Sequence, residues 1–287
     1  MDELASIIKN SFDGTIEYLK KNNIQVEEKL SLIILESYEE YQQKYGTNPR
    51  IHVGEYDRMR KEIHIIKNRL KEVIDEDIRH FNKIFIGNLF AISHNGILYP
   101  VYKNNDDIEK IIAETVTDSI VTHEIGHAVL HFVGGNSEWN ASFFEFLVYF
   151  YKNELYRYPE VYEIMEENIE ICEEYIKKEN PSSPYSLGSR LAPYSLGSCF
   201  ANDIIYTYEN ALNRNNELPR LNIKYIIEKL KFFSNDYYVE ITKTYNMILR
   251  DYIAIAKTLN AKYGMVKLDN KLFIRETTQY DKQYIIY

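Results

Sequence analysis

Two histidines and a glutamate within one short stretch are the residues of this chain best suited to chemistry. The stretch His123-Glu124-Ile125-Gly126-His127 places two imidazoles four residues apart, and on a helix this spacing puts both on the same face. Two such imidazoles can bind one zinc ion, and one further protein ligand would leave the fourth position open for water. Glu124 can then accept a proton from that water as it attacks a carbonyl carbon.

The residues around this motif favour a metal site over a pair of surface histidines. Ile120 and Val121 precede the first histidine, and Ala128, Val129 and Leu130 follow the second. On so apolar a helix, imidazoles without partners would be costly to bury, whereas a bound metal ion gives both rings a partner.

With this motif the sequence resembles the zincin metallopeptidases, over about residues 50–155 and most strongly over residues 122–130. Members of that family carry the motif on a helix packed under a small mixed sheet, and the edge strand of the sheet commonly binds extended peptide. The resemblance therefore implies a single zinc ion, hydrolysis of peptide bonds and a cleft for an extended peptide. It also implies a peptide-binding strand at residues 97–103 or 83–93.

The third protein ligand decides the subclass. A metzincin would carry glycine at position 130 and histidine at position 133, but this chain has Leu130 and Val133. The sequence is closer to the gluzincins, such as thermolysin and the aminopeptidase N group, in which a glutamate of the following helix completes the site. Two glutamates are candidates, Glu138 and Glu145, which lie seven residues apart and therefore on one helix face.

Of these two candidates we favour Glu145. It follows His127 by eighteen residues, close to the usual gluzincin separation, and lies in an apolar run where an unpaired carboxylate would be costly. A helical hairpin about Gly134-Gly135, with a rise of about 1.5 Å per residue, would bring it level with the histidines. Glu138 remains open, because it begins a Glu-x-x-Ala-Ser stretch similar to that of the aminopeptidases. It also suits the first turn of a helix.

A thermolysin-like site also needs a tyrosine or histidine that steadies the oxyanion of the tetrahedral intermediate. Candidates are Tyr194, Tyr185 and His94, with Tyr194 preferred because its Pro-Tyr-Ser-Leu-Gly stretch precedes a helix. In a chain with 26 tyrosines, a structural role is the more common explanation for each tyrosine taken singly. We interpret His131 as a supporting or core histidine, and Asp118 as a surface acid or a support for the site.

Apolar periodicity predicts an α+β, predominantly helical chain that holds these residues in three regions. Residues 1–45 are expected to form a helical hairpin. The resemblance implies that residues 46–157 form a zincin-like core, with a small mixed sheet over the active-site helix, and residues 158–287 would form a mainly helical region. The dipeptide Asn95-Gly96 between the strands at 83–93 and 97–103 is the strongest hairpin signal.

The remaining elements follow from the same patterns. The core should also contain a strand at 50–56 and helices at 59–81, at about 107–133 and at 137–155. Further helices are expected at 160–178, 199–213, 223–233 and 237–259, with a weak hairpin near Asp269-Asn270.

Composition excludes several functional classes. The formal charge of −9 argues against a nucleic-acid partner, because phosphate binding relies on clustered lysine and arginine. The most apolar window, residues 143–151, is too short to span a bilayer, so no membrane association is expected. Two cysteines, Cys172 and Cys199, are too few for a disulfide framework and are interpreted as buried thiols. Asp2 and Glu3 in place of a basic leader indicate a cytoplasmic protein.

The sequence therefore predicts a zinc metallopeptidase that acts on a peptide or protein, with its oligomeric state open. Three alternatives also remain open. The chain could be a zincin-fold binding or regulatory protein with little turnover, a peptidase with a single protein target, or a helical interaction module in which the motif is fortuitous.

Overall fold

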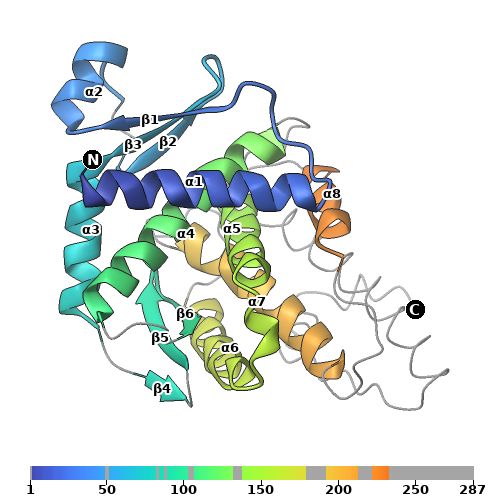
Figure 1. The fold of residues 1–287 in the computed structure, drawn as a ribbon. Helices are drawn as coiled ribbons and strands as arrows, with labels where there is room; N and C mark the ends of the chain where they lie inside the picture. The colour runs from blue at the N-terminus through green and yellow to red at the C-terminus, as the bar shows by residue number, and fades with distance from the viewer. Residues whose placement is uncertain are drawn as a thin grey trace.

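A computed structural model describes residues 2–48, 52–81, 84–86, 89–102, 107–131, 138–178, 192–212 and 222–232. Over these residues the chain is predominantly helical and belongs to the α+β class (Figure 1). The helices are α1 (Glu3–Lys21), α2 (Tyr38–Tyr45), α3 (Lys67–Arg79), α4 (Ile108–His131), α5 (Glu138–Lys152), α6 (Val161–Lys178), α7 (Ala192–Leu212) and α8 (Ile223–Phe232), with a 3-10 turn at Leu155–Arg157. The strands are β1 (Ser31–Leu35), β2 (Gly54–Asp57), β3 (Glu62–Ile66), β4 (Ile84–Ile86), β5 (Leu89–His94) and β6 (Ile97–Tyr102).

The N-terminal region is a helix followed by a strand, so the predicted helical hairpin is wrong. Helix α1 begins at an Asp2 cap, buries Ile8 and Leu19 on one face and packs against α4. The chain then forms β1, and only the short α2, capped by Ser37, remains of the expected second helix. The reason is that a short apolar run such as Leu32 to Leu35 fits a strand as well as part of a helix.

Strands β1, β3 and β2 form a mixed sheet in that order, which we call the N-terminal sheet. Strand β1 runs parallel to β3, and β2 runs antiparallel to it. Ile63 and Ile65 turn one face of β3 to the main core, while His64 and Ile66 turn the other face towards α2. This alternation has the period of a strand. The prediction of one helix over 59–81 is therefore wrong for residues 59–66 and holds only for α3.

Strands β4, β5 and β6 form a second, antiparallel sheet, which we call the meander. The predicted hairpin is confirmed: Asn95 and Gly96 have φ values of 50° and 76° and join β5 to β6. Two consecutive residues with positive φ are what a two-residue hairpin turn requires.

Helices α4 and α5 lie side by side between the two sheets (Figure 1). Gly126 lets them approach closely, because a Cβ atom at this position would lie 2.9 Å from Cδ1 of Phe144 and 3.3 Å from the carbonyl oxygen of Ala141. Both helices agree with the prediction within a few residues at each end. None of the described helices combines the length and apolar character that a bilayer-crossing segment needs.

Helices α6, α7 and α8 confirm the helical character of the described part of residues 158–287. The helix predicted at 237–259 and the hairpin at 269–270 lie outside the described residues. Cys172 of α6 and Cys199 of α7 are buried, as expected, but they form a disulfide instead of two thiols. The packing of α6 against α7 brings their Cα atoms to 5.8 Å. Their separation of 27 residues in the sequence does not indicate this proximity.

Candidate metal centre

The two histidines of the motif face each other across one turn of α4. Their Nε2 atoms lie 3.1 Å apart, and the rings meet edge to face. Both side chains belong to the protein interior and keep only a small opening to solvent, with relative exposures of 6% for His123 and 9% for His127. The pair is therefore placed so that both Nε2 lone pairs can meet on one ion.

Glu138, the first residue of α5, brings a carboxylate to the same point. Its Oε2 atom lies 3.0 Å from Nε2 of His123 and 3.4 Å from Nε2 of His127. In a tetrahedral zinc site with bonds of about 2.0–2.1 Å, neighbouring ligand atoms are separated by roughly 3.3 Å. The three separations are close to this value, so the spacing of His123, His127 and Glu138 fits one zinc ion.

Glu145 contacts the same histidine from the other side. Its Oε2 atom accepts a hydrogen bond from Nδ1 of His123 at 3.2 Å. Its Oε1 atom accepts hydrogen bonds from the hydroxyls of Tyr99, at 2.5 Å, and Ser119. Both carboxylate oxygens of Glu145 are therefore engaged away from the Nε2 atoms.

This geometry reverses our preference between the two glutamates. Glu145 was favoured because a buried carboxylate needs partners, but here two hydroxyls and one imidazole supply them. Glu138 follows His127 closely in the sequence, yet α5 begins at Glu138 and points it directly at both rings.

The electrostatics of the centre favour a cation. Burial lowers the pKa of His123, but the carboxylates of Glu138 and Glu145 outweigh burial and raise it to about 10. Burial disfavours ionisation of Glu138, yet hydrogen bonds from His123 and His127 hold its pKa well below the ordinary value. With neutral imidazoles the site contains three carboxylates, including Glu124, so a divalent ion would offset most of the negative charge.

Glu124 points from α4 towards the N-terminal sheet. A Cβ atom at Gly54 of β2 would lie 2.9 Å from both Cγ and Oε1 of Glu124, so only glycine allows this approach. Burial raises the pKa of the Glu124 carboxyl, against the opposing effect of His127 and His123. A carboxylate with a raised pKa is better suited to accept and return a proton near neutral pH.

Strand β2 next to Glu124 is an edge strand. The N–H of Ile66 donates to the carbonyl of Val53 at 2.9 Å, which makes 53 and 66 a hydrogen-bonded pair in this register. Pairs alternate along an antiparallel ladder, so Gly54, opposite Ile65, directs its N–H and C=O away from β3. No other described strand pairs with this edge.

The edge at 97–103 that the resemblance implied cannot take a peptide strand. The N–H of Leu98 donates to Oδ1 of Asn168, and Nδ2 of Asn168 donates to the carbonyl of Leu98, both at 2.8 Å. Pro100, the next outward residue, has no N–H, and its carbonyl accepts a hydrogen bond from the Tyr149 hydroxyl. The other expected segment, 83–93, contains the central strand β5, whose two neighbours occupy both of its edges, and the three-residue edge strand β4, which pairs only with β5 among the described strands.

The other sequence candidates do not join the centre within the described part of the chain. The side chains of Tyr194 and His131, and all of Tyr185, lie outside it. His94 lies at the turn of the meander, where its Nδ1 atom is 2.7 Å from Oδ2 of Asp77. Asp118 contacts Lys152 and Ser11, away from the metal-binding face.

Sequence analysis missed four residues that shape the centre. Ser119 precedes His123 by one helical turn, so the i, i+4 spacing could have indicated it. Ser142 lies with its Oγ atom 3.4 Å from Nδ1 of His123. Tyr99 and Gly54 carry no local signal, because they reach the centre from other elements.

Comparison of the chain with protein-family models, with curated proteins and with solved structures gave no match.

Proposed function

We propose that this chain is a zinc-dependent metallopeptidase of the gluzincin kind, in which His123, His127 and Glu138 hold one zinc ion. The observation that carries the proposal is the convergence of two Nε2 atoms and one carboxylate oxygen at separations of 3.0, 3.1 and 3.4 Å. The three ligand atoms come from two helices to the spacing that a tetrahedral zinc site requires, next to Glu124 of the same motif.

When bound, zinc would lower the pKa of a coordinated water and polarise the scissile carbonyl. Glu124 would accept the proton of the attacking water at a carboxylate oxygen and deliver it to the nitrogen of the leaving amine. Glu145 would hold the Nδ1 proton of His123, which keeps the Nε2 lone pair directed at the ion.

The substrate in this proposal is an extended peptide paired with β2. The outward N–H and C=O of Gly54 would bond to the peptide backbone, which places a substrate carbonyl near Glu124. Because main-chain pairing is independent of side chains, the proposal predicts binding of varied sequences that can lie extended.

Zinc content and turnover, measured together, test the proposal. Wild type should retain about one zinc ion per chain after gentle purification and cleave members of a quenched fluorescent peptide library. Glu124→Gln should keep the zinc and lose roughly 10²–10⁴-fold in turnover, because only the proton acceptor is removed. Glu138→Gln should lose the zinc and the activity together.

The outcomes separate this proposal from its rivals. If wild type holds zinc but shows no turnover that Glu124→Gln abolishes, the chain is a metal-binding protein without peptidase activity. Wild type that binds no zinc, even when refolded or dialysed with the ion, would contradict the metal centre itself. An exposed acid on α4, Glu109, provides the matched control, and Glu109→Gln should behave as wild type.

A further inference from the structure

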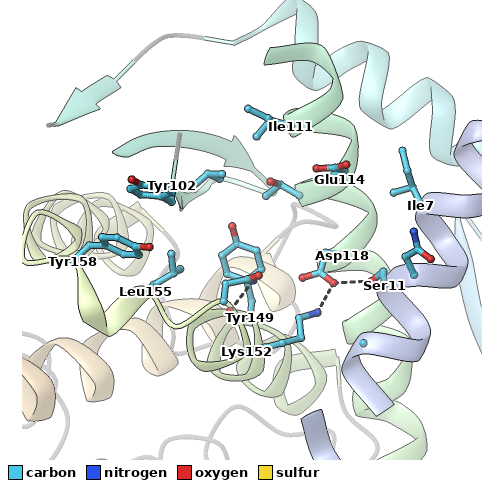
Figure 2. Close-up of a pocket in the computed structure, with 15 residues that line it drawn as sticks. Ile7, Ser11, Tyr102, Ile111, Glu114, Asp118, Tyr149, Lys152, Leu155 and Tyr158 are labelled. Carbon is cyan, nitrogen blue, oxygen red and sulfur yellow. Dashed lines mark hydrogen bonds and ion pairs between the residues drawn. The ribbon is translucent and has the colours of Figure 1, made fainter. Parts of the chain in front are cut away.

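A separate, open cavity lies at the N-terminal half of α4, bordered by α1, α4, α5 and the end of β6. It has a volume of about 540 Å³, within the range of about 300–1,000 Å³ typical of small-molecule sites. Figure 2 shows α1 and α4 forming one wall, Tyr102 and Tyr158 on the opposite side, and Tyr149 and Lys152 between them. None of its lining residues belongs to the metal centre.

An ion pair that is already satisfied lies on one side of this cavity. Lys152 pairs with Asp118 and also donates to Oγ1 of Thr15 at 2.8 Å, and Ser11 donates to Asp118 at 2.6 Å. Both charged side chains are mostly buried, with exposures of 13% and 14%. Lys152 is therefore committed to Asp118, and it has little capacity to attract an anion.

Glu114 adds a second carboxylate to the same wall. It precedes Asp118 by one helical turn, so both line the cavity from one face of α4 (Figure 2). Glu114 is exposed and has no hydrogen bond or ion pair with any described residue. The nearest lysine on its helix, Lys110, lies outside the lining and reaches towards Glu3 at 3.8 Å. The lining thus contains two carboxylates and one ammonium group, which leaves one negative charge.

Two stacked tyrosines form the opposite wall. The rings of Tyr102 and Tyr158 have centroids 4.6 Å apart and an interplanar angle of 17°. Tyr102 is 37% exposed, unlike the buried residues at the start of its strand. A partly exposed tyrosine opposite a carboxylate that has no partner among the described residues matches a ligand with a cationic end and an apolar body.

We propose that this cavity binds a small organic cation, a primary ammonium or guanidinium on an apolar or aromatic skeleton. The cationic group would pair with Glu114, and the skeleton would lie against Tyr102 and Tyr158. An anion would meet two carboxylates, and an uncharged molecule would leave Glu114 without a partner. This inference is independent of the proposed peptidase function.

Isothermal titration calorimetry on the full chain with phenethylamine tests the proposal. Phenethyl alcohol is an uncharged analogue of similar shape, and phenylacetate is an anionic one. We expect saturable one-to-one binding of phenethylamine, binding of the alcohol at least about tenfold weaker, and no binding of phenylacetate. The titrations include a chelator, so that an amine cannot bind through a metal ion.

Two variants locate the site. Glu114→Gln should weaken phenethylamine binding about tenfold and leave binding of the alcohol unchanged. Glu109→Gln removes an exposed acid of the same helix that is not part of the cavity lining, and it should have no effect. Tyr102→Leu, at an exposed position, should weaken both ligands.

Three results would overturn the proposal. They are equal affinity for the amine and the alcohol, equal effects of Glu114→Gln and Glu109→Gln, and no saturable binding of phenethylamine up to about 5 mM.

Discussion

Glu145 accepts a hydrogen bond from Nδ1 of His123 at 3.2 Å, on the side of the ring opposite to the Nε2 atom that faces His127. A histidine held in this way has one tautomer and one ring orientation. Tyr99 and Ser119 hold Glu145 in turn, so the arrangement extends from the meander through α5 to α4. The buried carboxylate therefore acts as a support for the candidate metal centre.

Glu145→Gln should weaken zinc binding without abolishing it. The amide keeps the shape of the side chain but loses the charge that fixes the Nδ1 proton of His123, and such a loss typically costs 10–100-fold in affinity. Competition with a chromophoric zinc chelator would measure this change. Glu138→Gln, compared in the same assay, should be the more damaging of the two. The opposite order would return the ligand role to Glu145.

Gly126→Ala should destabilise the protein by about 1–3 kcal/mol, because its new Cβ atom would press on Phe144 and the Ala141 carbonyl between α4 and α5. Urea unfolding followed by circular dichroism would measure the change in free energy. Gly14→Ala in α1 is the control, since nothing lies within 4 Å of a Cβ atom there. That helical substitution should stabilise the protein by about 0.5–1 kcal/mol. Similar values for the two variants would contradict the tight contact.

Gly54→Ala should impair turnover more than stability. The added methyl group would displace the Glu124 carboxylate or push β2 away, and either shift moves the proton acceptor relative to a peptide on the strand. Steady-state kinetics beside a thermal melt would separate the two effects. Gly46→Ala is the contrasting variant: Gly46 has a φ of 89° at the end of α2, so alanine there should cost stability and spare turnover. Unchanged kinetics in Gly54→Ala would argue against Glu124 acting beneath this strand.

His64 should make stability fall as pH rises. Burial lowers the pKa of His64, but Glu55 and Glu62 outweigh burial and raise it above the ordinary value. The protonated ring therefore stabilises the folded state fully below an unfolded pKa of about 6.5, and this contribution is lost as pH rises through the folded pKa.

Urea unfolding at several pH values between about 6 and 9 would measure this loss. In His64→Gln the decline across that window should be smaller than in wild type. His80→Gln, at an exposed position, should leave the decline unchanged. A decline of the same size in His64→Gln would show that another group is responsible.

Long periodic elements and explicit turn chemistry could be predicted from the sequence. Helix α4 has 24 residues of consistent pattern, and Asn95-Gly96 specifies its turn by backbone conformation alone. Strands β1 and β3 could not be predicted, since five apolar or alternating residues beside helices carry too little periodicity.

The motif on α4 was predictable, but the roles of the two glutamates were not. A buried carboxylate needs partners, and the sequence does not say whether a metal ion or two hydroxyls provide them. Tyr99, 46 residues away from Glu145, supplies one of these hydroxyls, and only tertiary packing brings it there. The disulfide was missed for the same reason, because it depends on how α6 packs against α7.

Under the proposed function, the closed edge of β6 and the outward-facing backbone of Gly54 on β2 have a consequence for the choice of ligand. A ligand that pairs with β2 must present an unsubstituted amide opposite Gly54. Proline or an N-methylated residue at that point would lack the donor, whichever side chains flank it. In the proposed peptidase, selection at this surface would therefore act on amide substitution and chain extension.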